Sequence, residues 1–290
     1  MTQALLSNFH NSLGEAQRLV EARLHALLPE LPGERLRAAM RYAVLGQGKR
    51  LRPYFVLESA KLFDVPQPRA LDVACALECV HCYSLVHDDL PAMDNDDLRR
   101  GLPTTHRKFD EATAILAGDG LLTFAFEILA WAQEPASIIL ALAKASGPHG
   151  MVGGQMHDIE AETKGFSSLA EISAMQRMKT GALFEFACVS GALMAGKDAA
   201  ALKTYADHIG LAFQIADDLL DVESTPEALG KATQKDGAKG KATFVSFLGL
   251  EGAKAEAARL VEQAIDALKT YGPKAEGLAE AARFIVSRRK

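Results

Sequence analysis

Apolar residues recur at intervals of three and four along almost the whole chain, and this spacing limits the possible folds more than any other feature of the sequence. Two clear stretches run from Leu71 to Val86 and from Ala212 to Val222. Residues three or four apart share one face of an α-helix, so the pattern predicts amphipathic helices. Alternating β-branched runs bounded by turn residues are almost absent, whereas Ala and Leu abound. We therefore predict an all-α fold with about ten or more helices.

No Pro/Ser-rich linker and no shift in composition divides the 290 residues. Length alone would allow about two domains, but nothing in the sequence marks a boundary between them. We predict a single domain over residues 1–290, with breaks between helices at Gly and Pro. Three glycines, Gly230, Gly237 and Gly240, predict a flexible loop late in the chain.

The chain carries 37 acidic and 32 basic side chains, a net charge of −5. This balance argues against nucleic-acid binding as the main function, because the phosphate backbone requires a basic face. The sequence contains no run of roughly 18 to 20 uninterrupted apolar residues, and residues 1–10 lack a basic region followed by an apolar one. Three of the four cysteines lie within eight positions, which is no disulfide framework. We predict a cytoplasmic protein without a membrane span.

A first acidic cluster follows the Leu71–Val86 stretch. Pro91 cannot continue a helix, because it lacks an N–H group and its ring clashes with the preceding turn, so the chain bends and can bring Asp94 back beside Asp88. Carboxylate oxygens suit hard cations, and the turn predicts half of a Mg²⁺ site. A solvated acidic loop is the alternative, whereas an EF-hand fails because Arg99 and Thr105 occupy its Gly and Glu positions. The five carboxylates of the cluster are Asp88, Asp89, Asp94, Asp96 and Asp97.

A second polar stripe lies opposite the apolar residues of the Ala212–Val222 stretch and consists of Gln214, Asp217, Asp218 and Asp221. Taken alone, such a stripe is typical of any surface helix. Two Asp-rich motifs on separate helices could, however, face each other across a cavity, where like charges repel unless cations bridge them. The pair predicts a site for several Mg²⁺ ions and a polyanion, most naturally a diphosphate.

A diphosphate also needs cationic partners, and Arg and Lys both supply them. Any one basic group alone is typical of a solvated face. The last group lies in the Gly-rich loop, which could close over a substrate and exclude water. The groups are Lys49, Arg50 and Arg52; Arg99 and Arg100; Lys179; and Lys231, Lys235, Lys239 and Lys241.

In their order, these motifs resemble those of the short-chain trans-isoprenyl diphosphate synthases, from about Arg41 to Lys241. The resemblance implies a helical bundle around a deep central cavity, three Mg²⁺ ions and a homodimer. It also implies head-to-tail condensation of isopentenyl diphosphate with dimethylallyl and geranyl diphosphate. The motifs are Gly48-Lys-Arg-Leu-Arg-Pro53, the D-D-x-x-x-x-D motif Asp88 to Asp94 with Arg99-Arg100-Gly101, Gly154-Gln155-x-x-Asp158, Lys179-Thr180 and Gln214-x-x-Asp217-Asp218-x-x-Asp221.

The resemblance also implies a role for each matching residue. Mg²⁺ would be held by Asp88, Asp89 and Asp94 from one wall and by Asp217 from the other, with Asp218 and Asp221 in support. The allylic diphosphate would be bound by Arg99, Lys179, Lys231 and Lys241, and isopentenyl diphosphate by Lys49, Arg52, His81 and Arg100. Thr180 and Gln214 would steady the developing carbocation, so that the catalytic set comprises Asp88, Asp89, Lys179, Thr180, Gln214 and Asp217. Asp221 matches less well, because Val222-Glu223-Ser224 follows it.

Tyr83 bears on the length of the product. It lies five residues before Asp88, about 7.5 Å further down a helix. An ideal helical wheel places Ser84 closer to the direction of Asp88, but serine is too small to block a cavity. In the family, a bulky aromatic here and two extra residues in the first Asp motif resemble the bacterial farnesyl (C15) type. The expected activity is farnesyl diphosphate synthesis; a geranyl or geranylgeranyl diphosphate synthase, and Tyr83 as a simple core residue, are the alternatives.

Other classes of protein fit less well. A di-iron carboxylate bundle needs two Glu-x-x-His pairs, and only Glu78-x-x-His81 is present. Cys75, Cys79 and Cys82 fall near one stripe of one helix and cannot surround a tetrahedral ion alone. Terpene cyclases have no need of the Gly48-to-Pro53 motif, and a non-catalytic helical subunit would be expected to have lost one Asp motif.

Overall fold

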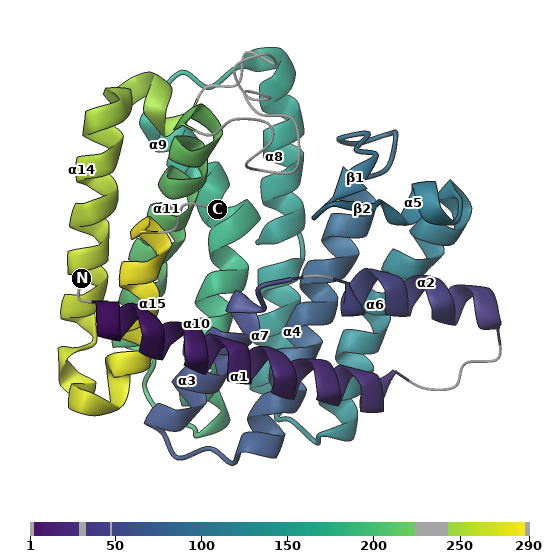
Figure 1. The fold of residues 1–290 in the computed structure, drawn as a ribbon, viewed down its shortest axis with the longest axis horizontal. Helices are drawn as coiled ribbons and strands as arrows, with labels where there is room; N and C mark the ends of the chain where they lie inside the picture. The colour runs from purple at the N-terminus through teal and green to yellow at the C-terminus, as the bar shows by residue number, and fades with distance from the viewer. Residues whose placement is uncertain (1–2, 29–32, 47, 224–242, 288–290) are drawn as a thin grey trace.

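The computed structural model describes residues 3–28, 33–46, 48–223 and 243–287. Helices make up most of these ranges (Figure 1), so the predicted all-α fold is confirmed. The elements in chain order are α1 (Gln3–Leu27), α2 (Glu34–Leu45), α3 (Leu51–Leu62), α4 (Gln67–Asp88), β1 (Leu98–Arg99), β2 (Leu102–Pro103), α5 (Thr105–Lys108), α6 (Glu111–Trp131), α7 (Ala136–Ser146), α8 (Met151–Lys164), α9 (Leu169–Gln176), the π-helical segment η1 (Arg177–Gly181), α10 (Ala182–Met194), α11 (Ala200–Glu223), α14 (Phe244–Ala267), the 3₁₀ segment η2 (Lys269–Ala275) and α15 (Glu276–Ser287).

Capping side chains fix where some of these helices begin. Asp110 accepts a hydrogen bond from the Thr113 backbone N–H at 2.6 Å, at the start of α6. Thr243 and Ser246 form a capping box at the start of α14. Such caps satisfy N–H groups that the first helical turn leaves without a partner.

The helix α4 is central to the bundle and contains the first predicted stretch. It packs against α3 and α6 and also contacts α10, and most of its side chains between Ala70 and Val86 are buried. Cys75, Cys79 and Cys82 lie in this core, where burial raises the pKa of each thiol. They are neutral packing residues. No group of three His, Cys, Asp or Glu within the described ranges is placed to hold a metal.

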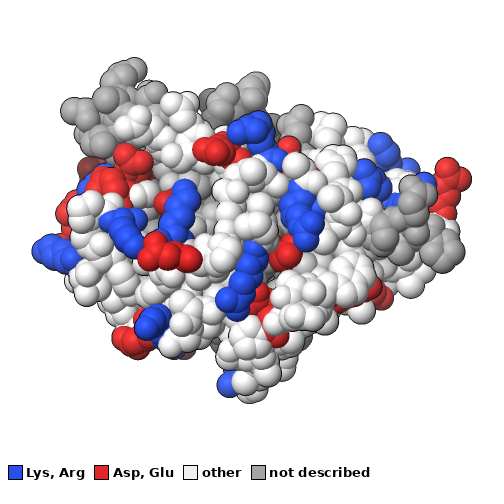
Figure 2. All heavy atoms as spheres, turned by 90° about the horizontal axis from the view of Figure 1, so that it is seen from below, with Lys and Arg blue, Asp and Glu red and all other residues white. Residues whose placement is uncertain are grey.

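One described helix, α6, is long and apolar enough to cross a membrane by length and composition, with a mean hydropathy of 1.5. Half of its apolar window is buried inside the bundle, and the core helix of a soluble protein has the same properties, so this is a weak indication of a span. On the face drawn in Figure 2, Lys and Arg lie interspersed with Asp and Glu. This face therefore lacks the continuous basic surface that nucleic acid requires.

Candidate active site

The first Asp motif lies at the C-terminal end of α4, directly before the β1–β2 hairpin (Figure 1). Asp88 is the last residue of the helix and Asp89 is its C-cap. After the turn through Pro91, the Asp94 backbone N–H donates to the Asp88 carbonyl at 2.8 Å. The predicted return of Asp94 to Asp88 is therefore confirmed, and two carboxylates of the motif extend from one turn.

The environment of Asp88 disfavours its charge. Burial raises the pKa of this carboxyl from the ordinary 3.8 to about 6. Lys179 and Arg99 oppose the shift, whereas the neighbouring Asp94 carboxylate increases it. Partly buried carboxylates that repel each other are stabilised when a bound cation neutralises their charge.

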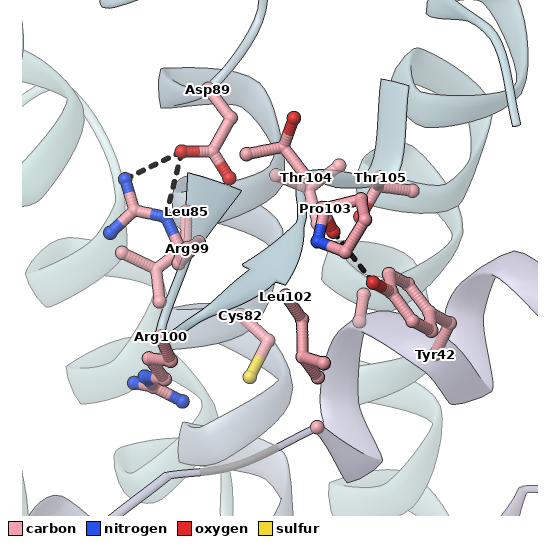
Figure 3. Close-up of a pocket in the computed structure, with 13 residues that line it drawn as sticks. Tyr42, Cys82, Leu85, Asp89, Arg99, Arg100, Leu102, Pro103, Thr104 and Thr105 are labelled. Carbon is pink, nitrogen blue, oxygen red and sulfur yellow. Dashed lines mark hydrogen bonds and ion pairs between the residues drawn. The ribbon is translucent and has the colours of Figure 1, made fainter. Parts of the chain in front are cut away.

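Asp89 has a different partner. Its Oδ1 atom accepts a hydrogen bond from Arg99 Nε at 2.7 Å and lies 2.6 Å from Arg99 Nη2. Dashed lines mark both contacts in Figure 3. The Asp89 side chain is only 4% exposed. This pairing makes Asp89 the anchor of Arg99 through Oδ1, and its role as a metal ligand stays a prediction.

The β1–β2 hairpin directs Arg99 and Arg100 to different places. The strands pair in antiparallel register around a turn in which Arg100 has φ 54° and Gly101 has φ 78°. A positive φ is costly for a residue with a Cβ atom, so the surrounding structure must hold Arg100 in place. In Figure 3, Arg99 faces Asp89 and Arg100 points away from it. The Arg100 guanidinium lies against Gly48, where a Cβ atom would collide with it.

A cavity of about 580 Å³ opens beside the hairpin. It is the size of a small-molecule binding site. Seven predicted site residues line it: Lys49, Arg52, His81, Arg99, Arg100, Thr180 and Asp217. Arg50 lines it too, and among the lining residues without a predicted role are Gln17, Glu78, Phe213 and Phe284. The position of Glu78 could have been foreseen, because it lies one helical turn before His81.

Arg52 and His81 form a buried pair in this cavity. Arg52 Nη1 lies 3.3 Å from His81 Nε2, and the Arg52 guanidinium stacks 4.8 Å from the centre of the Phe184 ring. Burial lowers the pKa of Arg52 to about 10, so the guanidinium keeps its charge at neutral pH. Burial and the nearby arginines hold the pKa of His81 well below its ordinary value, so the neutral ring accepts a hydrogen bond from Arg52. The buried Arg52 Nε has no hydrogen-bond partner among the described residues, which suits an incoming oxyanion.

Lys179 and Thr180 lie in the π-helical turn η1. Lys179 Nζ donates to Asp158 Oδ2 at 2.6 Å, and Thr180 Oγ1 lies 3.5 Å from Gln176 Oε1. A Cβ atom at Gly154 would collide with the Lys179 backbone. The Gly154-Gln155-x-x-Asp158 motif thus lets η1 approach α8 and holds the Lys179 ammonium.

The residues of the second Asp motif have different environments, although they share one helix. Asp217 lines the cavity. Asp218 is buried, accepts a hydrogen bond from the Phe244 backbone N–H at 2.9 Å and another from Gln214 Nε2 at 3.0 Å, and so caps α14. Asp221 lies one turn further along α11 and is partly buried, and its supporting role stays a prediction. These contacts favour Asp217 over Asp218 as the metal ligand.

Three further predicted residues lie apart from the cavity or outside the described ranges. Tyr83 is buried, and its ring makes an edge contact with the His87 ring at 5.8 Å between centroids. His87 Nε2 in turn lies 3.0 Å from the Ile115 carbonyl oxygen, so Tyr83 faces the side of α4 that packs on α6. Lys231 and Lys241 lie outside the described residues, and their contacts with the allylic diphosphate stay predictions.

The carboxylates fit Mg²⁺ by their chemistry. Asp88 and Asp94 extend from one turn, and Asp217 lines the cavity next to it. They do not meet as a complete three-residue site within the described ranges. Mg²⁺ usually takes one or two protein carboxylates and completes its octahedron with water and substrate phosphates. The donor set therefore suits Mg²⁺ bound together with a diphosphate.

Comparison with known proteins identifies the family. Residues 33–280 match the polyprenyl synthetase family. Farnesyl diphosphate synthase of Geobacillus stearothermophilus is 42% identical over 95% of this chain and 96% of the relative. Geranylgeranyl diphosphate synthase of Cyanophora paradoxa is 43% identical over 98% of both chains. A crystal structure of an FPP/GFPP synthase from Zymomonas mobilis has a TM-score of 0.87 at 45% identity, covering 97% of this chain and 99% of that one. The chain belongs to the polyprenyl synthetase family.

Proposed function

We propose that this protein is a prenyltransferase that condenses isopentenyl diphosphate head-to-tail with dimethylallyl and geranyl diphosphate to give farnesyl diphosphate (C15) and diphosphate. The observation that best supports this function is that one hairpin directs two adjacent arginines to two different places. Arg99 lies beside the first Asp motif, whereas Arg100 lies against the loop that contains Lys49. Two diphosphate esters that react with each other need two such sites within reach. Membership of the family supports the same activity.

The allylic diphosphate is assigned to the side of the first Asp motif. Arg99, anchored by Asp89, and Lys179, anchored by Asp158, are positioned to donate charge-assisted hydrogen bonds to phosphate oxygens. These bonds strengthen as negative charge builds up on the departing diphosphate. Stabilisation of that charge is the main catalytic contribution of the protein.

Mg²⁺ completes this side of the site. Asp88, Asp94 and Asp217 would hold it, and it supplies positive charge against the leaving diphosphate when bound. Asp89 and Asp218 support these ligands indirectly through Arg99 and α14.

Isopentenyl diphosphate is assigned to the cavity. Arg52 and Arg100 offer guanidinium donors and Lys49 an ammonium donor. Neutral His81 orients Arg52 by accepting its hydrogen bond. The C–O bond between the allylic carbon and its diphosphate breaks, and the alkene of isopentenyl diphosphate attacks that carbon.

The resulting carbocation needs oxygen atoms nearby and then loses a proton. Thr180 lines the cavity, and Gln214 uses its amide nitrogen, not its oxygen, in its hydrogen bond to Asp218. In the cavity, the Glu78 carboxylate and the neutral His81 ring already pair with Arg50 and Arg52. The released diphosphate is the natural proton acceptor, because its oxygens lie beside the reacting carbons.

Incubation with isopentenyl and geranyl diphosphates and Mg²⁺ tests the proposed function. Phosphatase treatment and chromatography should then reveal farnesol as the main alcohol. Omission of Mg²⁺ or of isopentenyl diphosphate is the control and should abolish it. No prenyl product would contradict the function, and geranylgeraniol as the main product would identify the alternative activity named for the Cyanophora relative.

Arg100→Ala should raise the KM for isopentenyl diphosphate and leave the KM for the allylic diphosphate nearly unchanged. Arg99→Ala should raise the KM for the allylic diphosphate and leave that for isopentenyl diphosphate nearly unchanged. The reason is that Arg100 lies beside Gly48 and Arg99 beside Asp89. Loss of a charge-assisted contact costs roughly 1.5 to 3 kcal/mol, or about 10- to 150-fold in KM. Steady-state kinetics with each substrate varied in turn measures this. Equal effects of both variants on both substrates would mean that the two arginines form one undivided basic patch.

A homodimer is part of the proposal, and apolar side chains left exposed on two helices support it. On α8 they occur at intervals of four and three, which places Val152, Met156 and Ile159 on one face. On α6, Ile115 and Leu116 are 44% and 58% exposed. Exposed apolar patches of this kind are typical of protein–protein interfaces.

Met156→Glu should therefore halve the molecular mass measured by light scattering after gel filtration. The substitution places an unpaired charge in the proposed interface, where it cannot be solvated. Phe247→Glu is the matched control, because Phe247 is 42% exposed but lies on α14, at the left edge of Figure 1, whereas α8 and α6 lie to the right of it. A dimeric Met156→Glu protein would exclude this face of α8 from the interface.

We also propose a cytoplasmic location and a single domain. All four cysteines are buried and unpaired, as reducing conditions would leave them. One contiguous apolar cluster extends from Phe9 in α1 to Ile285 in α15, which supports a single folding unit.

A further inference from the structure

The cavity beside the hairpin concentrates positive charge. Five cationic side chains line it, whereas Glu78 and Asp217 are its only carboxylates among the described residues. Like charges at such density repel one another and destabilise the arrangement unless other groups hold them. The five are Lys49, Arg50, Arg52, Arg99 and Arg100.

Both terminal nitrogens of the Arg50 guanidinium are held by groups of the protein. Nη1 donates to Glu78 Oε1 at 2.6 Å, and Nη2 donates to the carbonyl oxygens of Val44 at 2.8 Å and Gly46 at 2.9 Å. Glu21 of α1 lies 3.7 Å from Nη2. The Arg50 side chain is 0% exposed and that of Glu78 is 2% exposed. Nη1 and Nη2 of Arg50 are thus used within the protein, and only its buried Nε has no hydrogen-bond partner among the described residues.

These bonds join three parts of the protein. Val44 and Gly46 lie at the C-terminal end of α2, and Glu78 lies in the middle of α4. Arg50 itself has a left-handed backbone, with φ 50° and ψ 35°, at the N-cap of α3. A residue with a Cβ atom adopts this conformation only where its surroundings hold it there.

The same contacts fix the segment that carries the isopentenyl diphosphate ligands. Lys49 precedes Arg50, and Arg52 lies in the first turn of the helix that Arg50 caps. Gln17 Nε2 donates to the Gly48 carbonyl oxygen at 3.2 Å and ties the segment to α1. A Cβ atom at Gly48 would lie 3.0 Å from Arg50 Nη1, so the segment packs directly on the ion pair.

We infer that Arg50 and Glu78 are positioning residues that pre-form the isopentenyl diphosphate subsite, with Glu78 as the buried counter-charge that allows five cations to share one cavity. Both residues line the cavity, but we infer that the pair acts on the diphosphate through its neighbours. It sets the places of Lys49 and Arg52 and offsets their mutual repulsion before the diphosphate arrives. The inference rests on the proposed function for the identity of the substrate.

Glu78→Gln tests the inference, because it removes the counter-charge and keeps the shape. We expect the KM for isopentenyl diphosphate to rise about tenfold or more, since displacement of binding groups by an ångström costs this much or more. The KM for geranyl diphosphate should stay within about twofold, because Arg99 and Lys179 have their own anchors, Asp89 and Asp158. Calorimetric titration with isopentenyl diphosphate alone should show the same loss of affinity.

The matched control is Glu134→Gln. Glu134 forms an ion pair with Arg69, at 2.7 and 2.8 Å, in which the Glu134 side chain is 0% exposed and that of Arg69 is 33% exposed. This pair does not line the cavity, so the substitution should lower the melting temperature and leave both KM values unchanged. A purely structural role of Glu78 would make the two variants alike, and this result would overturn the inference.

Arg50→Lys is the second variant, and it tests the positioning role of the pair if Glu78→Gln does not fold. Lysine keeps the charge beside Glu78 but cannot bond Glu78 and both carbonyls with the geometry of a guanidinium. It should raise the KM for isopentenyl diphosphate selectively. Unchanged affinity in a folded Arg50→Lys protein would contradict the inference. Wild-type protein that makes no prenyl product would instead contradict the proposed function, which separates the two failures.

Discussion

Asp88→Asn should lower kcat by about three orders of magnitude or more and at the same time stabilise the enzyme in the absence of Mg²⁺ and substrates. Activity falls because an amide is a far poorer Mg²⁺ ligand than a carboxylate, and electrostatic stabilisation of the leaving diphosphate is lost. Stability rises because burial and Asp94 already disfavour the Asp88 charge. A gain in stability together with a loss of activity is typical of groups kept for function.

The pH dependence of the stabilisation follows from the direction of the pKa shift. The folded protein raises the pKa of Asp88 from 3.8 to about 6, so between these values it binds a proton more readily than the unfolded chain. Stability is therefore lost as the pH rises through this window, by on the order of 1–3 kcal/mol at 1.36 kcal/mol per pH unit. The melting temperature of Asp88→Asn should exceed that of the wild type most at pH 7 to 8 and least near pH 4 to 5.

Differential scanning calorimetry at these pH values, without Mg²⁺, measures the effect. Asp97→Asn is the matched control, because Asp97 lies in the same loop but its side chain is 65% exposed. That variant should leave both kcat and the melting temperature close to wild type. Near-normal kcat of Asp88→Asn, or an equal loss of kcat in Asp97→Asn, would contradict the role of Asp88 as a Mg²⁺ ligand.

The parts of the site that could be predicted from sequence depend on local rules. The three- and four-residue spacing predicts α4 and α11, because helix periodicity is a property of neighbouring residues. The return of Asp94 to Asp88 follows from Pro91, which cannot continue the helix. Both features involve residues fewer than ten positions apart.

The parts that could not be predicted depend on contacts between distant residues. A helical wheel puts Asp217 and Asp218 on one polar stripe, but Asp218 turns to cap a helix that begins 26 residues later. The left-handed turn at Arg50 is stabilised by Glu78, 28 residues away. The π-helical turn at Lys179 arises where Gly154 allows η1 to pack closely on α8. No local pattern reports such long-range contacts.

Tyr83→Ala should lengthen the main product from C15 to C20 or longer chains. Tyr83 lies about 7.5 Å below Asp88 along α4, near the length of one isoprene unit. Its ring is buried between α4 and α6 and packs on His87. Burial also raises the pKa of its hydroxyl to about 12, so the ring stays uncharged. Removing this ring should open space between α4 and α6 at this depth, where we expect a growing chain to extend.

Chromatography of the alcohols after phosphatase treatment measures the change, with geranylgeraniol expected to replace farnesol as the main product of Tyr83→Ala. Tyr83→Phe is the matched control and should still stop at C15, because it keeps the ring and loses only the hydroxyl. Deletion of a buried aromatic costs roughly 3 to 5 kcal/mol, so Tyr83→Leu, which retains more of the packing, provides a second test if the alanine variant unfolds. Active, folded Tyr83→Ala or Tyr83→Leu enzyme that still stops at C15 would mean that Tyr83 is a packing residue, and that another side chain closes the cavity.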